Sequence, residues 1–493
     1  MKHDLWRPIH LLALSAALAG CAIGPNYHRP EVPVPAKYAE LRGWTQAAPA
    51  DAAPRGAWWS AFDDPLMDRL EPLVETSNPN VAVSYANYRQ ALAAFRVARS
   101  EIVPTIGVTA TASRAHSNAA ASTGAPSVLS SGDLEGTASW TLDLWGAVRR
   151  RIQENAANAE QSEALLANAL LAEQTLLATT VVELRVTDAQ IALHEATVKA
   201  YRESLRITEQ QAAVGLSSAP PSAVLAARVA LETEQATLTS LGIARAQYVH
   251  ALAVLVGQNP EELSLPRDAR LPKLPEVPAG LPSTLLQRRP DIAAAERAMA
   301  AANAGIGVAE AAYFPTISLS AADGVSQSPL RGLLHSANNV WSLGASGAVA
   351  LIDLGARRAG VVSARAAYDA ALANYRATVL GAFEHVENDL ASLRILAEQA
   401  AQLDVAVRDA KQGTQVALAE FEAGTVDYTA VSQAQIAQLL DQESALQVAQ
   451  SRLVTAVALI GDVGGGWSTE RLHDPLRPLH WLPTPLGADT PTP

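Results

Sequence analysis

The sequence is poor in cysteine, in aromatic residues and in basic charge. Its 493 residues include one cysteine, 5% are aromatic, and the formal net charge is -12. An acidic chain without a basic stripe argues against nucleic acid as a partner. A single cysteine leaves the chain without an internal disulfide. The abundant Ala and Leu, with so few aromatic side chains, suit long and closely packed helices better than a bulky globular core.

Motifs that carry catalysis or bind metal are also missing. His194-Glu195 and Glu384-His385 each place a histidine beside a carboxylate, but neither extends to the His-Glu-x-x-His spacing of a zinc enzyme. The sequence contains no Gly-rich phosphate loop and no nucleophile elbow. We therefore expect no catalytic residue, no metal site and no cofactor, which leaves an enzyme as a remote alternative.

Long apolar runs are absent after residue 21. No uninterrupted run there reaches the 18 or more residues of a spanning helix, so the mature chain can cross a membrane only with β-strands. Residues 1–20 differ, because a charged start and an apolar run predict a bacterial secretory signal. The sequence Leu-Ala-Gly-Cys at 18–21 resembles a lipobox, in which the cysteine becomes the lipidated first residue. The alternative is a signal peptide cleaved nearby and an incidental cysteine.

We expect Cys21 to carry the lipid, with palmitate or related acyl chains. Ala22 follows rather than Asp, which in this resemblance favours the outer membrane over retention at the inner one. Several acyl chains would anchor the protein firmly, because each buried methylene contributes roughly 0.8 kcal/mol. Residues 21–57 are rich in Pro and Ala, and they predict an extended strap with little packing of its own.

An internal duplication organises the rest of the chain. The sequence Asn-Pro-Asn-Val at 78–81 recurs as Arg-Pro-Asp-Ile at 289–292, an offset of 211 residues, and Gly215 matches Gly424 at an offset of 209. A repeat that keeps its register this long is a duplicated structural unit. We expect a first copy, a Pro-rich linker, a second copy and an irregular tail. Their bounds are 58–260, 261–282, 283–463 and 464–493.

Each copy predicts two strands. Apolar and polar residues alternate with period two after Pro104 and again after Pro315, and this pattern is typical of a strand with two unlike faces. Aromatic residues such as Trp140 and Trp341 lie near the predicted strand ends, as in the girdles of membrane barrels. The alternative is a small soluble β-layer. The expected strands are about 104–116, 134–145, 315–325 and 339–354.

Each copy also predicts a long helical hairpin. Apolar residues recur every seven positions, from Leu170 through Leu177 and Leu184 in the first copy and from Val379 through Val386 in the second. Sustained heptads indicate supercoiled helices. No Pro or Gly interrupts residues 148–214, which would form a helix about 100 Å long. The hairpin tips are expected near residues 215 and 424.

Four strands are too few to close a membrane barrel, which needs about eight. An open edge in lipid would leave backbone groups unsatisfied. Other subunits must complete the sheet, and three copies would supply twelve strands. The helical hairpins would then continue the barrel as a hollow tube.

Short segments along the chain carry a resemblance to a known family. They are Cys-Ala-Ile-Gly-Pro-Asn-Tyr at 21–27, Trp-Trp at 58–59, Phe-Asp-Asp-Pro-Leu at 62–66, Asn-Pro-Asn at 78–80, Arg-Arg-Pro-Asp-Ile at 288–292, Tyr-Phe-Pro at 313–315, and Phe421 with Gly424. Taken together, these segments make the chain similar to an outer-membrane efflux lipoprotein of the TolC/OprM (NodT-like) class.

The resemblance implies an α+β membrane protein, in which a trimeric 12-stranded β-barrel, four strands per chain, is continued by a periplasmic coiled-coil α-helical barrel. It also implies a homotrimer in outer-membrane lipid that docks to a periplasmic adaptor (membrane fusion) protein and an inner-membrane RND-type transporter.

The resemblance also points to functional residues at the hairpin tips. In the family, rings of residues just after the second tip hold the periplasmic end closed, and the tips are where the adaptor or pump docks. Three chains place each such residue three times around the axis. Gln433 stands where many relatives have Asp, so an amide ring replaces an acidic one. The candidate gate is Phe421, Asp427, Val431 and Gln433, and the candidate docking tips are Gly215, Leu216, Ser217, Gly424, Thr425 and Val426.

The leading hypothesis is the exit duct of a tripartite drug-efflux pump. A duct for a type I protein secretion system has the same fold, and a periplasmic coiled-coil scaffold lipoprotein without a channel is a third hypothesis. The predicted strands discriminate against the scaffold, which needs none. Acidic and basic residues at the strand-to-helix junctions, Asp143 with Arg149-Arg150 and Asp353 with Arg357-Arg358, are expected either to pair or to face the channel or lipid headgroups.

Overall fold

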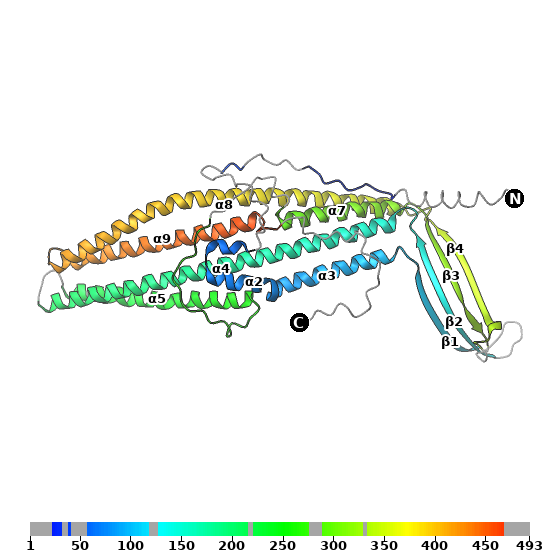
Figure 1. Ribbon diagram of the computed structural model, residues 1–493, viewed down its shortest axis with the longest axis horizontal. Coiled ribbons are helices and arrows are strands. Elements are labelled where there is room, and N and C mark those ends of the chain that lie inside the picture. The colour runs from blue at the N-terminus through cyan, green and yellow to red at the C-terminus, as the bar shows by residue number, and fades with distance from the viewer. Residues whose placement is uncertain are drawn as a thin grey trace.

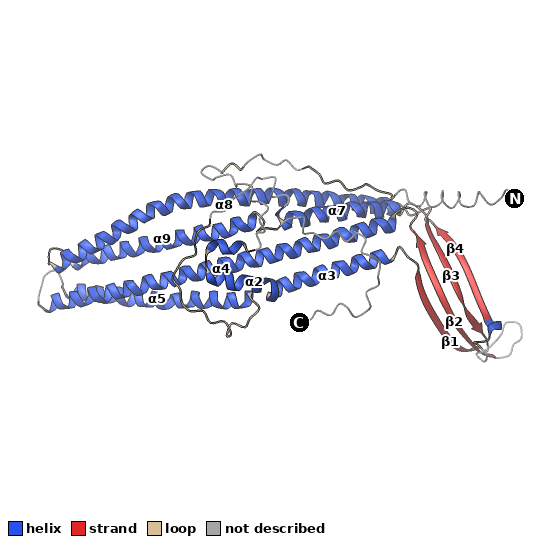
Figure 2. Ribbon diagram, viewed as in Figure 1, coloured by secondary structure: helices blue, strands red, loops and turns tan. Residues whose placement is uncertain are grey.

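The molecule is elongated, with a helical body and a four-stranded sheet at one end (Figure 1). Figure 2 separates the two regions by secondary structure. The structure is a computed structural model, and it describes residues 22–31, 38–40, 57–117, 127–214, 220–275, 288–328 and 333–467. The expected signal peptide, Cys21 and the tail beyond residue 467 lie outside the described residues.

The described residues of the first copy form four α-helices and two strands. A short 3₁₀ helix, η1 (Trp58–Phe62), precedes them. The helix α4 is 67 residues long, as the uninterrupted heptad segment predicts, and α5 packs back along it. The elements are α2 (Pro65–Ser77), α3 (Pro79–Ser100), β1 (Thr105–Ser117), β2 (Ser127–Leu142), α4 (Ala147–Ala213) and α5 (Pro221–Leu255).

The second copy repeats this plan with matching lengths. The helices α3 and α7 both have 22 residues, α4 and α8 both have 67, and α5 and α9 both have 35. This agreement confirms that the sequence repeat is a structural duplication. The elements are α7 (Pro290–Ala311), β3 (Thr316–Gln327), the 3₁₀ helix η2 (Ser336–Asn338), β4 (Asn339–Ala348), α8 (Ala356–Glu422) and α9 (Tyr428–Asp462).

Caps and prolines set the starts of the helices that surround α4. The carboxylate of Asp64 accepts from the backbone N–H of Leu66 at 2.7 Å, and the amide oxygen of Asn78 accepts from that of Asn80 at 2.8 Å. A proline occupies the first turn of α2, α3 and α7. Proline suits this position, because its fixed φ fits a helix and its missing N–H would have no partner there.

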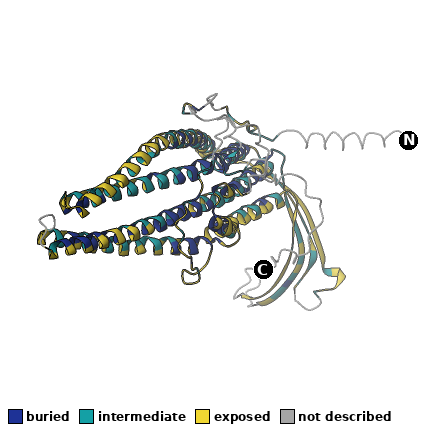
Figure 3. Cartoon of the chain, turned by 60° about the vertical axis from the view of Figure 1, so that its left-hand side comes forward, coloured by how far each residue is buried: buried dark blue, intermediate teal, exposed yellow. Residues whose placement is uncertain are grey.

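The apolar core lies in the helical body (Figure 3). Heptad residues on α4, such as Leu177, Leu184 and Ile191, are almost fully buried, and so are Val379 and Val386 on α8. Their spacing places one apolar stripe on each long helix against its neighbours. Packing along these stripes therefore holds the two hairpins side by side.

The sheet is antiparallel and has the strand order β1-β2-β3-β4 (Figure 1). The strand β2 begins at Ser127, earlier than the expected residue 134, because Ser127–Ser131 pair with Ser113–Ser117 on β1. Small polar residues in this stretch hide the alternation that marks the rest of the strand. The sequence prediction was therefore wrong about this end of β2.

The strand β4 is shorter than expected. It ends at Ala348, rather than at about residue 354, where it pairs with Thr316, the first residue of β3. Pro315 precedes Thr316 and has no N–H to donate to a further rung. The alternating residues from Val349 onward consequently have no strand beside them.

Among the described residues, one helix is long and apolar enough to span a membrane by length and composition. An 18-residue window of α4 has a mean hydropathy of 1.4, and 33% of that window is buried. In the structure α4 packs against α3, α5, α7 and α9 along its length. Leu177 and Val181 are buried in this packing, whereas Leu165 and Leu176 are exposed in the single chain.

Candidate functional site: the sheet faces and the hairpin tips

The strand register gives the sheet one largely apolar face, on which Arg114, His116 and Asp323 lie toward the end far from the helices. Residues directly opposite each other on neighbouring strands point to the same side. Ile106, Ala138, Ala321 and Leu343 form one such row across the four strands. Ile106 is 79% exposed and Leu343 is 76% exposed, so this apolar face is uncovered in the single chain. Further rows on the same face contain Val108, Leu134, Trp140, Leu142, Ile317, Leu319 and Trp341.

The opposite face is lined by hydroxyl and acidic side chains. The hydroxyl of Thr111 donates to Asp133 Oδ2 at 2.8 Å, and the hydroxyl of Ser326 donates to Asp133 Oδ1 at 2.5 Å. These bonds join β1, β2 and β3 across the polar face. The face also contains Thr105, Thr109, Glu135, Thr137, Ser139, Thr141, Thr316, Ser318, Ser320, Ser342 and Ser346.

The two outer strands of the sheet are open edges. The strand β1 pairs only with β2, and β4 pairs only with β3, among the residues that the structure describes. An apolar face opposite a polar face is the pattern of a strand between lipid and water. Because lipid offers no hydrogen bonds, such edges need partner strands before the sheet can lie in a membrane.

Ion pairs mark the passage from each strand pair to its long helix. Arg149 Nε lies 3.0 Å from Asp143 Oδ2, and Arg357 Nε lies 2.5 Å from Asp353 Oδ2. Each carboxylate also accepts from backbone N–H groups at the start of its helix. Of the two readings left open by the sequence, pairing is the one observed for Arg149 and Arg357. Hydrogen bonds from Arg357 and from the helix backbone hold the pKa of Asp353 below its usual range.

The second tip is a tight turn. Gly424 has φ of 74°, a left-handed conformation that favours glycine. The backbone N–H of Thr425 donates to Glu420 O at 3.0 Å, which closes the end of α8. Beside the tips, a hollow of about 400 Å³ is lined by residues from the ends of α4 and α8, among them Arg206, Gln210 and Glu422.

The other candidate tip lies outside the described residues, which stop at Val214 and resume at Pro220. Gly215, Leu216 and Ser217 therefore have no structural description, whereas Gly424, Thr425 and Val426 do.

Two of the four candidate gate residues are core residues of the single chain. Phe421 and Val431 are both 0% exposed, and Phe421 packs edge-to-face on Tyr428 with ring centroids 5.9 Å apart. They form a small cluster with Ile207 and Ala227 of the first hairpin. In this conformation neither side chain can face an open lumen, because its apolar surface is buried in the contact between the hairpins.

The other two candidates lie on the surface of α9. Asp427 caps the helix, and its carboxylate accepts from the backbone N–H of Thr429 at 2.9 Å. Gln433 is exposed. Gln433 can thus face solvent while the cluster behind it stays packed, and Asp427 does so while it caps the helix.

Polar contacts also join the two hairpins, both at this cluster and further from the tips. We call these contacts the hairpin seam, and they are made by Gln211, Gln435 and His194 with their partners. Gln435 Nε2 on α9 donates to Ser204 Oγ on α4 at 2.8 Å. Gln211 Nε2 on α4 donates to Phe421 O at 2.9 Å. His194 completes the seam higher on α4.

His194 lies between two carboxylates. Its Nδ1 is 2.6 Å from Glu234 Oε1 on α5, and its Nε2 is 3.0 Å from Glu443 Oε1 on α9. The imidazole is 3% exposed, so these partners replace its hydration. The sequence marked His194 only as a possible catalytic or metal residue, and it gave no sign of this role in joining helices.

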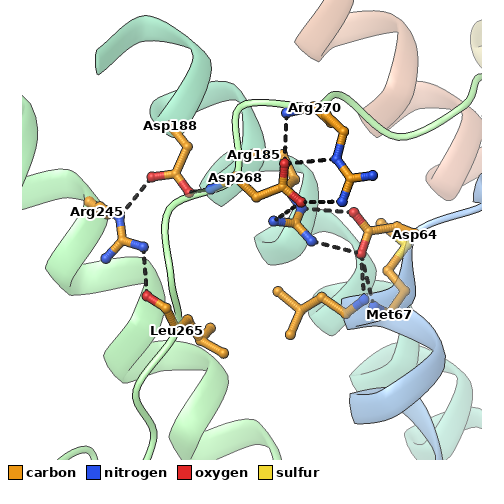
Figure 4. Close-up of polar contacts among 9 residues, drawn as sticks. Asp64, Met67, Arg185, Asp188, Arg245, Leu265, Asp268 and Arg270 are labelled. Atoms are coloured by element: carbon orange, nitrogen blue, oxygen red, sulfur yellow. Dashed lines mark hydrogen bonds and ion pairs between the residues drawn. The ribbon is translucent and has the colours of Figure 1, made fainter. Parts of the chain in front are cut away.

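A second polar cluster fixes the first hairpin to the start of the linker (Figure 4). Arg185 on α4 binds Asp64 through Nε at 2.8 Å and through Nη2 at 3.2 Å, and its Nη1 lies 3.2 Å from Asp268. Arg245 on α5 binds Asp188 at 2.7 Å. Hydrogen bonds from the neighbouring Arg270 hold the pKa of Asp268 at about 2, so its carboxylate stays ionised.

The second hairpin is held more loosely within the chain. Between Leu393 and Phe421, α8 has no buried residue among those described, whereas α4 has buried residues down to Gln211. In the middle of α8, burial and the neighbouring Asp462 raise the pKa of Asp389 to about 7. The two hairpins are therefore equal in length and unequal in packing.

Comparison with known proteins identifies relatives along nearly the whole chain. A sequence model of the family described as "Outer membrane efflux protein" matches residues 72–258 and 281–465. The chain is 31% identical to the toluene efflux pump outer membrane protein TtgC of Pseudomonas putida, over 92% of this chain and 95% of that protein. It is 28% identical to the outer membrane protein OprJ of Pseudomonas aeruginosa, over 94% of this chain and 96% of that protein.

Solved structures agree with this result. The outer-membrane channel OprN superposes with a TM-score of 0.84 at 30% identity, covering 91% of this chain and 100% of that chain. The CmeC outer membrane channel of Campylobacter jejuni superposes with a TM-score of 0.85, covering 91% of this chain and 96% of that chain. At 22% identity, the likeness to CmeC shows the fold alone.

Proposed function

The chain belongs to the outer membrane efflux protein family, and we propose that it is the exit duct of a tripartite pump with a periplasmic adaptor and an inner-membrane RND-type transporter. The family and its relatives make it an outer-membrane efflux channel protein. The adaptor, the transporter and the efflux of drugs or other small molecules are the finer part of the proposal. The pump would supply the energy, and the duct would supply a water-filled path.

The sheet is the observation that carries this proposal. One face is apolar and exposed, the other is lined by hydroxyl and carboxylate groups, and both edges are open. Three copies would close twelve strands with the apolar face to lipid and the polar face to water. A periplasmic scaffold would have no use for such a sheet.

Lipidation at Cys21 is a separate proposal. The lipobox-like sequence at 18–21 supports it, and so does the position of Ala22, whose carbonyl lies beside the start of α4 near the sheet. Mass spectrometry of the N-terminal peptide tests it: a diacylglyceryl-modified cysteine is expected, and an unmodified Cys21 would contradict it.

We further propose that the tips form the docking and gating end. Gly424, Thr425 and Val426, with Gly215, Leu216 and Ser217, would meet the adaptor. Gln433 would line the closed constriction, held in place by Phe421 and Val431 packed behind it and by the cap at Asp427. Parting the hairpins would exchange the buried polar contacts of the seam for contacts with water, at a small net cost of about 1 kcal/mol each.

A conductance measurement tests the gate. Trimers with Gln433→Ala are expected to open more often than the wild type, because the ring loses its hydrogen-bonding amides. Ile436→Ala is a matched control, since Ile436 is also exposed on α9 one turn further along. Identical gating in all three proteins would remove Gln433 from the constriction.

A growth assay tests the pump assignment. A strain without its own outer-membrane ducts is given this chain together with the adaptor and the RND transporter of a related efflux pump. Restored resistance to dyes and antibiotics is expected. Restored secretion of a large protein, with no gain in resistance, would instead favour the type I secretion duct.

A further inference from the structure

Residues 22–26 lie in a site formed by the start of α4 and the end of α7, at the sheet end of the helical body. We call this site the cradle. Arg150 on α4 is 3% exposed and points at this segment. Its Nε donates to Ile23 O at 3.0 Å, and its Nη2 donates to Gly24 O at 2.9 Å and to Asn26 Oδ1 at 3.0 Å. One guanidinium thus binds the backbone carbonyls of Ile23 and Gly24 and the side-chain amide oxygen of Asn26.

The segment is held from other sides as well. The backbone N–H of Ile23 donates to Trp145 O at 3.0 Å, just before α4 begins. The amide of Asn303 on α7 donates to Pro25 O at 3.1 Å. Apart from the bond to Asn26 Oδ1, these contacts use backbone groups of the segment. The site therefore recognises the path of the backbone, which turns at Gly24 with φ of 95°, more than the side chains.

Glycines make the close approach possible. A Cβ on Gly307 would lie 2.8 Å from Ile23 O and 2.8 Å from Arg150 Cγ. A Cβ on Gly146 would lie 2.5 Å from the Cα of Ala22. Atoms cannot stay this close, so any larger residue at these positions would displace the segment or Arg150.

Arg150 in turn depends on the segment for most of its hydrogen-bond acceptors. The acceptors that Arg150 reaches in the described part of the chain are neutral oxygens, those named above with Ala22 O and Gln153 Oε1. Hydrogen bonds from a charged donor are roughly twice as strong as neutral ones. An empty cradle would leave a buried cation without most of its acceptors, which is unfavourable.

The cradle lies where the sheet passes into the helical body. Trp145 stacks on Phe314 with ring centroids 4.9 Å apart, and its Nε1 donates to Pro315 O at 2.7 Å. Aromatic side chains of this kind gather at the boundary between membrane and water. Consecutive Cα atoms are about 3.8 Å apart, so a lipid on residue 21 is attached one residue from this point.

From these contacts we infer that the cradle is a docking site for the N-terminal segment and sets the level at which the lipid on Cys21 enters the membrane. The inference rests on the proposed lipidation for its second half only. The segment docks through backbone hydrogen bonds, so it stays docked when the lipid is absent. The chain then has two attachments at the membrane boundary, its own sheet and a lipid fixed beside that sheet.

Docking also fixes the strap that follows. The Tyr27 hydroxyl donates to Glu296 on α7. Further on, the backbone N–H groups of Ala39 and Glu40 donate to the two carboxylate oxygens of Glu387 on α8, at 2.7 and 3.0 Å. The described parts of the strap therefore tie the membrane boundary to α8, which has no buried residue between Leu393 and Phe421.

Hydrogen exchange in detergent-solubilised protein tests the docking. In the wild type and in Cys21→Ser, the peptide containing Ile23 should be protected to the same degree. Arg150→Ala and Gly307→Ala should speed exchange of this peptide at least tenfold in both backgrounds, with peptides from α5 and α9 unchanged.

Two neighbouring substitutions are matched controls. Arg151 follows Arg150 but pairs with Glu101 on the surface, and a Cβ on Gly305 would meet only Glu154 Oε1, at 3.8 Å. Arg151→Ala and Gly305→Ala should therefore leave the Ile23 peptide protected.

The outcomes separate the inference from the lipidation proposal. Equal exchange in Arg150→Ala, Gly307→Ala and the wild type would overturn the cradle, and so would protection that vanishes in Cys21→Ser. An unmodified Cys21 with a protected Ile23 peptide would overturn the lipid and leave the docking intact. If Arg150→Ala yields no folded protein, Gly307→Ala and Arg150→Lys decide.

Discussion

Glu71 on α2 is buried without a partner. Its side chain is 0% exposed, and neither carboxyl oxygen has a hydrogen-bond partner among the described residues. Burial raises the pKa of this carboxyl from 4.5 to about 9. The folded protein consequently holds a proton on Glu71 at neutral pH, which the unfolded chain releases.

We expect this proton to make stability depend on pH. Because the folded pKa is the higher one, the stabilisation is fully present below about pH 4.5 and is lost as pH rises toward 9. One proton per chain gives a slope of at most about 1.4 kcal/mol per pH unit. Thermal unfolding between pH 5.5 and 8.5 should show this slope in the wild type and a smaller slope in Glu71→Gln.

The control lies on the same helix. Glu75 is exposed on α2, so Glu75→Gln should keep the pH slope of the wild type. If Glu71→Gln and Glu75→Gln follow the wild type equally, Glu71 does not hold the proton.

At the residue scale, the sequence predicts which residues occupy special positions better than it predicts which residues contact one another. Gly424 at a tip follows from its place after a long heptad segment, since a chain reversal favours glycine. The partners of His194 and Arg150 could not be predicted. Glu234 is 40 residues from His194, and Ile23 is 127 residues from Arg150, and only the packed fold brings them together. Phe421 and Val431 were proposed as gate residues from their position near the second tip, and the sequence did not indicate that both side chains are buried between the hairpins.

At the scale of elements, the Pro and Gly residues that bound the helical segments made helix lengths predictable. The helix α4 fills the interval before the first tip, and α9 begins soon after Gly424. Strand ends were harder, because pairing extends as far as the neighbouring backbone allows. Ser127–Ser131 join β2 through their partners on β1 and through no apolar pattern of their own. The hairpin seam could not be predicted, because its contacts join residues that only the packed fold brings together.

The seam predicts how the hairpins part. His194→Ala would leave Glu234, which is 6% exposed, beside Glu443 without the group between them. Removing a hydrogen bond to a charged group costs about 2 kcal/mol. We expect faster hydrogen exchange in the lower halves of α8 and α9 and a larger open fraction in lipid bilayers.

A threonine one turn away is the control for this experiment. Thr197 donates only within its own helix, to Leu193 O at 3.0 Å, among the contacts that the structure describes. Thr197→Ala should leave exchange and opening unchanged. Equal behaviour of His194→Ala and Thr197→Ala would show that the seam does not hold the hairpins together.

At the scale of the whole molecule, the open edges of the sheet determine the assembly. Val108 on β1 and Trp341 on β4 lie at one level of the sheet, because Val108 pairs with Gly136, Gly136 with Asp323 and Asp323 with Trp341. In a closed barrel, β1 of one chain lies beside β4 of the next. Cysteines on these two edges should therefore link neighbouring chains.

We expect oxidation of Val108→Cys combined with Trp341→Cys, Leu343→Cys or Ala345→Cys to yield covalent dimers and trimers, in a Cys21→Ser background. The three partners allow for the stagger between strands of a barrel. Gly136→Cys with Trp341→Cys is the control, since β2 is an inner strand. Monomers alone from every edge pair would contradict the assembly, and so would ladders that extend beyond trimers.

The most direct measurement is the current through a planar lipid bilayer that contains the purified protein. If three chains close a barrel with a polar lumen, the wild type should give discrete conductance steps of uniform size, and Gln433→Ala should increase the time spent open. Bilayers with inserted protein that stay silent for both the wild type and Gln433→Ala would contradict the central claim that this chain builds a duct.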